Sequence, residues 1–518
     1  PKPGCGPTCT RADQIIDTGD RMHKAITRSL AILGVGLVGL AGVITANTLS
    51  GDAPEKRPPM QAPVQAPEPP AVDVARAARN LSEAVRFQTI SHQDPAEDRL
   101  ENWTAFHTWL ARTYPRTHAS LALTRLAERT LVFHWAGRDP KAAPLVLMAH
   151  QDVVPVNPET LSAWTHPPFD GVIAEGRVWG RGTLDDKGAL IALMEATESL
   201  LARGYRPQRG VYLVFGHDEE RGGTGAQAAA RWFKAQGIVP EMIVDEGGLV
   251  LDQAPVTGKP LALIGVTEKG YGSLKLTATG SGGHASMPPD QTAVDALAEA
   301  LIRIRAKPLK AKLDAPTTDM LDVMAMDAPL ALKVALRNRW LTGSLVQDQL
   351  SQSPEARAML RTTLAPTRLS GSPKDNVLPE TAEAVLNVRL HPRDTPDSVL
   401  AHVRTQIKGL PVKADWAEPP MAAPPLSPTD NAAYATLKMA LAAEYPDVPA
   451  APWLMIAATD ARHMSGVSPN IYRILPARLT AKDIAGLHGV DESLSIENLE
   501  RMTRVYGRLI QAGDQTTP

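Results

Sequence analysis

The residues best suited to chemistry in this 518-residue chain are histidines and carboxylates that stand at the ends of short apolar runs. His150 closes the run PLVLMAH and Asp152 follows it. Glu219 and Glu220 belong to the sequence HDEE, which follows the run VYLVFG, and the run MIVD ends at Asp245. If these runs are parallel strands of an open α/β sheet, their carboxyl ends meet at one edge, where such sheets bind ligands.

A glycine-rich segment, WGRGTLDDKG, supplies two more carboxylates just before a helical pattern. One of them could bind two metal ions, one through each oxygen, or Asp185 or Asp186 could simply cap the helix. Taken together, the strand-end residues offer nitrogen and oxygen donors, and the only cysteines, Cys5 and Cys9, lie in the N-terminal tail. This donor set suits a hydrolytic zinc centre, with a second metal about 3.5–4 Å away if a carboxylate bridges the two.

Strands and helices must alternate to position these residues. Apolar runs predict strands, and apolar residues at helical spacing predict helices between them, in the order 131–137, 144–150, helix 188–203, 211–216, helix 224–236 and 242–245. This alternation predicts an α/β fold with a mostly parallel central sheet. The end of the chain predicts a helix at residues 496–511, with Ser495 as its N-cap.

The pattern changes near residue 263. The segments 273–280 and 384–390 alternate polar and apolar residues as half-buried strands do, and a helical pattern covers 293–305. This predicts an α+β domain at 264–415, inserted between two parts of a catalytic domain at 74–263 and 416–518.

The N-terminal region has a different composition, and the predicted boundaries are a tail at 1–28, an apolar stretch at 29–49 and a proline-rich linker at 50–73. Residues 30–49 carry no charge and have about the length of a membrane-spanning helix or signal anchor. The basic residues before it favour a cytoplasmic N-terminus, with the catalytic part on the outer (periplasmic, extracellular or lumenal) side. The alternative is a signal peptide cleaved near Ala46, which predicts secretion.

Charge excludes one class of partner. The formal net charge is −2 at pH 7, so the composition offers no basic surface for nucleic acid.

The motif series as a whole resembles the M20 metallopeptidases. It consists of His150–x–Asp152, GRGTLDDKG, DEE, DEGG and a late HGVDE that begins at His488. Within that family, residues 75–513 are most similar to the branch of carboxypeptidase S, aminoacylases and N-acyl amino acid hydrolases. The resemblance implies a zinc-peptidase-like catalytic domain with an inserted lid or dimerisation domain, and two zinc ions per subunit. Co²⁺ or Mn²⁺ could occupy the same ligands.

The resemblance also implies a role for each residue of the centre. His150 and Asp245 hold one metal, Glu220 and His488 hold the other, and Asp185 bridges them. In addition, the resemblance implies that Asp152 orients His150, that Glu219 is the general base, and that the bond between Asp185 and Asp186 is cis.

Four further residues are implied to act on the substrate. His284, in GGHASMP, reaches the active site of a neighbouring subunit in the family and donates to the oxyanion of the tetrahedral intermediate. Asn376 and Arg389 match lid positions that contact the substrate carbonyl and carboxylate, and Arg462, in ATDARH, suits a substrate carboxylate. Without the resemblance, Asn376 and Arg389 are ordinary polar residues of a loop or strand.

The expected function is hydrolysis of a C-terminal peptide bond or an N-acyl amino acid amide by metal-activated water, which releases a free amino acid. The expected substrate is therefore a small peptide or N-acyl amino acid, and the expected assembly is a homodimer or a monomer. One alternative is a narrow aminoacylase or an N-fatty-acyl amino acid hydrolase or synthase. Another is an inactive, membrane-tethered binding protein on an M20 scaffold. A phosphate-ester hydrolase is disfavoured because the chain lacks a GxxxxGK[ST] loop.

Overall fold

The computed structural model describes residues 40–49 and 66–514, which fall into two units. The first unit contains the helix at 40–49 together with Ala325–Val346. That segment includes α9 (Leu330–Arg337) and most of α10 (Arg339–Leu350). Within this unit, Asn338 Nδ2 donates to Thr48 Oγ1 at 3.1 Å. The second unit contains all the other described residues.

The membrane span predicted at residues 29–49 is contradicted. Residues 29–39 lie outside the described residues, and 40–49 are helical. Among the residues that the structure describes, no helix is both long and apolar enough to span a membrane. This finding overturns the membrane anchor, the membrane contact and the outer-side location predicted from the apolar stretch.

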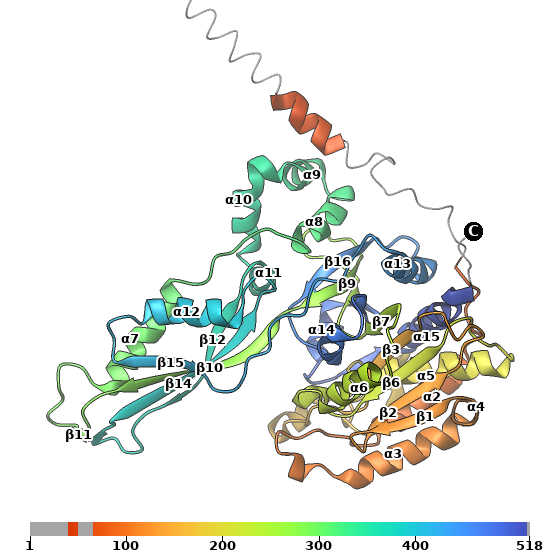
Figure 1. The fold of residues 1–518 in the computed structure, drawn as a ribbon, viewed down its shortest axis with the longest axis horizontal. Helices are drawn as coiled ribbons and strands as arrows, with labels where there is room; N and C mark the ends of the chain where they lie inside the picture. The colour runs from red at the N-terminus through yellow and green to blue at the C-terminus, as the bar shows by residue number, and fades with distance from the viewer. Residues whose placement is uncertain (1–39, 50–65, 515–518) are drawn as a thin grey trace, which may run out of the picture. The chain divides into compact units, whose positions relative to one another are not determined.

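The central sheet of the second unit has ten strands in the order β1-β2-β6-β3-β7-β17-β9-β8-β18, with β16 beside β9 (Figure 1). Its middle strands are parallel: β3 (Leu145–His150) pairs in parallel with both β6 (Val211–Gly216) and β7 (Met242–Asp245). Every residue of these three strands is buried, which explains why they are continuous apolar runs. The remaining strands are β1 (Ala122–Leu126), β2 (Thr130–Trp135), β8 (Leu249–Leu251), β9 (Leu261–Glu268), β16 (Ala450–Met455), β17 (Ile471–Arg473) and β18 (Arg478–Leu479).

Helices cover both faces of this sheet, as the alternating sequence pattern predicts. One face packs against α2 (Val74–Val85), α5 (Lys187–Ala202) and α15 (Ile496–Gln511), and the other against α6 (Thr224–Ala235). The predicted C-terminal helix is confirmed with its cap, because Ser495 Oγ accepts the Asn498 backbone N–H at 3.1 Å. The other helices of this part are α3 (Leu100–Thr113), α4 (Pro115–Ser120), α13 (Ala432–Glu444) and α14 (Ala481–Gly486). A small sheet joins β19 (Ser493–Ser495), β5 (Arg177–Trp179) and β4 (Val172–Ala174).

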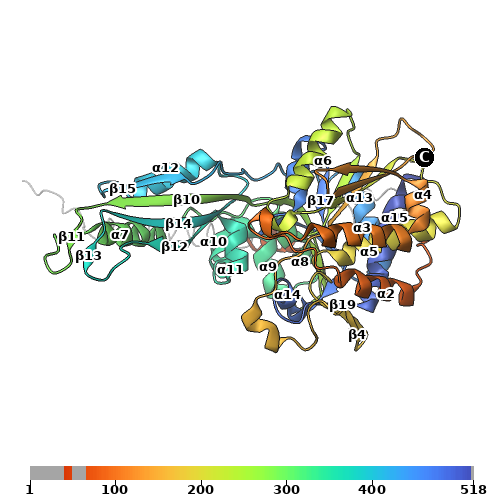
Figure 2. The same ribbon diagram turned by 90° about the horizontal axis from the view of Figure 1, so that it is seen from below.

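A second sheet follows directly from the first, because Lys269 alone separates β9 from β10 (Gly270–Thr279). It is antiparallel, with the order β12-β14-β10-β15 (Figure 2). Its apolar face packs against α7 (Ala293–Ala306) and α12 (Pro396–Gln406), as the alternating pattern predicts. The other elements here are α8 (Thr317–Met326), α11 (Pro354–Leu360), β12 (Thr363–Ser370), β14 (Thr381–Leu390), β15 (Val412–Trp416) and the pair β11 (Gly283–His284) and β13 (Val377–Leu378).

Candidate active site

Three neighbouring parallel strands bring the predicted ligands to one edge of the central sheet. His150 is the last residue of β3, and Asp245 is the last residue of β7. Glu219 and Glu220 begin a short 3₁₀ turn just after β6. Because β6, β3 and β7 run in the same direction, their carboxyl ends place these four side chains together.

Asp185 lies between two histidines. Its Oδ1 is 2.8 Å from His150 Nε2, and its Oδ2 is 3.1 Å from His488 Nε2. The same His488 nitrogen is 3.1 Å from Glu220 Oε1. Donor atoms of His150, Asp185 and Glu220 all lie within 4.8 Å of one another, close enough to share a metal centre. One carboxylate oxygen on each side is the arrangement that a bridging ligand requires.

Asp152 contacts several groups of the cluster and holds them in place. It is fully buried, and its Oδ1 lies 3.3 Å from His150 Nδ1, on the opposite side of the ring from Asp185. Its carboxylate also accepts the Ser91 hydroxyl at 2.5 Å and the backbone N–H groups of Glu219 and Glu220, each at 3.2 Å. His150 Nδ1 also lies 3.0 Å from the Asp152 backbone oxygen. Asp152 therefore holds the imidazole with its backbone and its carboxylate, and the carboxylate also holds the turn that carries the two glutamates, as residues that orient metal ligands commonly do.

The loop that carries Asp185 is held by a residue that the sequence analysis did not single out. Glu492 is buried, and its Oε1 accepts the backbone N–H groups of Gly182, Leu184 and Asp185 at 2.9–3.2 Å. Its Oε2 is paired with Arg181 at 2.6 Å. Glu492 is the last residue of the HGVDE motif, which begins at His488. Its membership of that motif is the sequence feature that could have identified it.

The peptide bond between Asp185 and Asp186 is cis, as the family resemblance implies. Asp186 occupies the N-cap position of α5, but its side chain makes no capping hydrogen bond. Its Oδ2 accepts the backbone N–H of His150 at 3.3 Å instead. The simple helix-cap interpretation of these two aspartates therefore does not hold.

Asp245 is anchored by a backbone group from another part of the chain. Its Oδ2 accepts the Ala461 N–H at 2.7 Å. The neighbouring Asp460 is buried, and neither of its carboxylate oxygens has a hydrogen-bond partner among the described residues. The ATDARH segment thus contributes more to this region than the single Arg462 that the sequence analysis selected.

Burial strongly perturbs the acidic groups of the cluster. Desolvation raises the pKa of Glu220 to about 7 and raises the pKa of Asp245 and of Glu219. Hydrogen bonds that His488 donates to the carboxylates of Asp185 and Glu220 raise its pKa to about 10. Several carboxylates thus face one another where water solvates them poorly, and such a set is stabilised by bound cations. With two imidazoles among them, the donors fit zinc ions.

The substrate residues predicted from the resemblance are only partly brought together. Arg462 Nη1 lies 3.8 Å from Glu219 Oε1. Arg389, on β14, stacks over the Tyr271 ring at 5.0 Å and lies close enough to Arg462 and Glu219 to interact electrostatically. His284 and Asn376 are both exposed and belong to the β11–β13 end of the second sheet, away from the central sheet (Figure 1). Within this chain they do not join the cluster.

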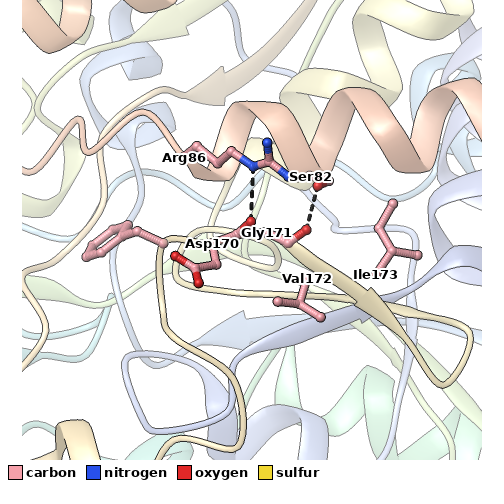
Figure 3. A pocket seen from close by; sticks show the side chains of 7 residues that line it. Ser82, Arg86, Asp170, Gly171, Val172 and Ile173 are labelled. Atoms are coloured by element: carbon pink, nitrogen blue, oxygen red, sulfur yellow. Dashed lines mark hydrogen bonds between the residues drawn. The ribbon is translucent and has the colours of Figure 1, made fainter.

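A cavity of about 710 Å³ lies elsewhere, between α2 and residues 169–173 (Figure 3). Arg86 Nε donates to the backbone oxygen of Asp170 at 3.0 Å, and Ser82 donates to the backbone oxygen of Gly171. Both contacts join a side chain to a backbone oxygen. The cavity lining contains no histidine and no pair of carboxylates. The cavity therefore offers no counterpart to the acidic cluster.

The sequence profile of peptidase family M20/M25/M40 matches residues 146–512, which contain every member of the cluster. The chain belongs to the M20 family. This M20 enzyme is 36% identical over 494 residues to a probable carboxypeptidase S-like protein of Dictyostelium discoideum, a match that covers 94% of the chain and 93% of the relative. It is 34% identical over 443 residues to an N-fatty-acyl-amino acid synthase/hydrolase of Xenopus tropicalis, with 84% and 85% covered.

A solved structure agrees on the fold. An M20 family metallo-carboxypeptidase from Sulfolobus solfataricus superposes with a TM-score of 0.61 at 17% identity, over 84% of this chain and 98% of the other. The M20 protein is thus a metallocarboxypeptidase-like hydrolase, and the predicted enzyme class and α/β fold are confirmed.

Proposed function

We propose that this M20 hydrolase uses two zinc ions to cleave a C-terminal peptide bond or an N-acyl amino acid amide and releases a free amino acid. The observation that carries the proposal is Asp185, whose two oxygens face His150 and His488 at 2.8 and 3.1 Å. A carboxylate held between two imidazoles suits two metals better than one, because each metal then has its own histidine and shares the bridge.

The ligand assignment follows from this division. His150 and Asp245 would hold one zinc ion, Glu220 and His488 the other, and Asp185 both. When bound, the two ions polarise the carbonyl of the scissile bond and lower the pKa of the attacking water.

Glu219 is the proposed general base. Its side chain is about one-tenth exposed and lies beside the ligand Glu220, and burial raises its pKa well above the usual value for glutamate. A carboxylate with a raised pKa accepts a proton from water readily and then donates it to the amine that leaves. Asp152 contributes by fixing the backbone of Glu219.

Two guanidinium groups favour substrates with a free carboxylate. Arg462 and Arg389 lie near Glu219, and carboxylates bind guanidinium through paired hydrogen bonds. Cleavage of a C-terminal peptide bond and cleavage of an N-acyl amino acid both release the amino acid that carries this carboxylate. The second candidate function is the narrower N-fatty-acyl-amino acid synthase or hydrolase activity, which is the activity in the name of the Xenopus relative.

The test is release of free amino acid from a panel of dipeptides, N-acetyl amino acids and N-oleoyl amino acids by the full chain with added zinc. Glu219→Ala should retain bound zinc and lose at least about a hundredfold in kcat. The matched control is Glu101→Ala, a change at an exposed helical position. We expect activity to disappear after chelation and to return with zinc. A zinc-loaded, folded protein that hydrolyses no member of the panel would refute the proposal.

A further inference from the structure

A second cavity, of about 360 Å³, lies between residues 424–428 and residues 465–471. Its volume falls in the range of small-molecule sites, roughly 300–1,000 Å³. Pro424, Val467 and Ile471 are buried and form apolar parts of its wall. The cavity contains none of the proposed zinc ligands and none of the substrate residues assigned above.

The two buried serines of the wall already have partners. Ser427 Oγ donates to the Ile471 carbonyl at 2.8 Å, and Ser468 Oγ donates to the Pro240 carbonyl at 2.9 Å. Their hydroxyl protons are therefore committed to the fold and are not available to a ligand.

Arg473 is the wall residue with donors to spare. Its side chain is 1% exposed, and its Nε donates to Glu268 Oε2 at 2.6 Å. Its Nη1 has one long contact, 3.5 Å to the Ile471 carbonyl, and its Nη2 has no partner among the described residues. A buried donor without an acceptor destabilises the fold, so an acceptor that entered the cavity would offset part of that cost.

A second cation stands at the rim. A Cβ atom placed on Gly466 would lie only 2.4 Å from Lys234 Nζ, so the ammonium group lies beside this residue of the cavity lining. Within the described part of the chain, no carboxylate pairs with Lys234. Arg473, in contrast, pairs with Glu268 and also interacts electrostatically with Asp245.

We propose that this cavity is a binding site for a small aliphatic monocarboxylate. The carboxylate accepts from Arg473 and is attracted by Lys234, and the alkyl chain lies against Pro424, Val467 and Ile471. The apolar wall favours a ligand with an alkyl chain and disfavours phosphate and other ligands without an apolar body.

The site is linked to the catalytic centre through one strand. Arg473 pairs with Asp245 in the register of β17 and β7, and the next residue, Ile474, donates its N–H to the Asp245 backbone oxygen at 2.7 Å. A ligand that moves Arg473 therefore acts on the backbone of a proposed zinc ligand. We expect occupancy to lower kcat.

The experiment titrates hexanoate, and in parallel uncharged hexanamide, into the full chain by isothermal titration calorimetry. Hexanoate should bind saturably, and hexanamide at least about tenfold more weakly, the value of one charge-assisted hydrogen bond. Two changes at exposed positions should each weaken hexanoate binding: Lys234→Gln, which removes the rim charge, and Ser465→Trp, which fills the mouth. Lys259→Gln, the same charge change at an exposed position outside the cavity, should not.

Arg389→Gln is the control for binding at the catalytic centre and should leave the affinity for hexanoate unchanged. Absence of saturable binding, equal affinity for hexanamide, or wild-type affinity in both Lys234→Gln and Ser465→Trp would overturn the proposal. Loss of binding in Arg389→Gln would do the same, because the ligand would then occupy the substrate site. The effect on kcat, which should vanish in Ser465→Trp, rests on the proposed hydrolase activity, whereas the calorimetry does not.

Discussion

Arg462 Nη1 lies 3.8 Å from Glu219 Oε1, so a guanidinium group stands beside the proposed base. The neighbouring His463 helps to hold it, because His463 Nε2 accepts the Arg462 Nε–H at 3.2 Å. At this position Arg462 can bind the carboxylate of a substrate whose scissile bond is within reach of Glu219.

Arg462→Gln should therefore raise KM for N-acyl amino acids by about tenfold or more and change kcat much less, since uniform binding is lost. An N-acyl amino acid amide, which lacks the carboxylate, should respond little. Arg231→Gln, a change at an exposed position of α6, serves as the control. A fall in kcat with unchanged KM for both substrates would instead show that Arg462 acts on Glu219 rather than on the substrate.

Asp152 is expected to control metal affinity. Asp152→Asn removes the negative charge beside His150 Nδ1 while keeping the size of the side chain, and such changes typically weaken metal binding about 10–100-fold. Zinc competition with a chromophoric chelator measures the effect. Ser91→Ala, which removes only the 2.5 Å hydrogen bond to Asp152, should have a smaller effect. Equal zinc affinity in wild type and Asp152→Asn would contradict this role.

The strand ends of the site could be predicted from the sequence, because fully buried strands are apolar runs and the first polar residue marks where each run stops. His150 and Asp245 are the clearest cases. Parallel order then places these ends together without any knowledge of long-range contacts.

The supports of the site could not be predicted in this way. Ser91 and Asp152 are 61 residues apart, and Asp245 is held by an N–H group 216 residues away. Such pairings depend on how loops pack, and a single serine or a backbone N–H carries no local signal. The N-terminal apolar stretch was predicted to span a membrane from its composition alone, but no helix among the described residues is both long and apolar enough to do so.

Substitution of His284 would show whether two subunits share one active site. It lies on β11, where its Nδ1 accepts the Ser286 backbone N–H at 3.1 Å, and it does not join the cluster of its own chain. If it acts on the site of a partner subunit, His284→Ala and Glu219→Ala should each be nearly inactive, but mixing them should restore activity in heterodimers. Each heterodimer has one complete site, with Glu219 from one subunit and His284 from the other.

The mixture should therefore be more active than the sum of its two components after subunits have exchanged. A mixture of Glu219→Ala with Asp185→Asn, which both damage the same side of the interface, is the control and should stay inactive. Additive activities in the first mixture, despite a dimer by light scattering, would contradict sharing of His284.

Lys269 lies at the junction of the two sheets, and we expect it to make the free energy of unfolding depend on pH. Its ammonium donates to the Ala358 and Arg361 carbonyls at 3.1 and 3.0 Å and to the Thr363 hydroxyl at 3.2 Å, with no carboxylate among these partners. Burial lowers the pKa of Lys269 to about 7. The charges of Arg389 and Arg393 contribute to this lowering of the pKa, and the charge of Asp394 opposes it.

Between this folded pKa and the value near 10.4 of an unfolded lysine, the unfolded chain binds more protons, so stability rises with pH. Below about pH 7 the cost of burying the charge is present in full. We expect the stability of wild type relative to Lys269→Met to increase by up to about 1.4 kcal/mol per pH unit from pH 7 to 10. Urea unfolding of both proteins across this range measures it. The exposed change Lys259→Met should give a constant difference, and a constant difference for Lys269→Met would show that Lys269 stays charged in the folded protein.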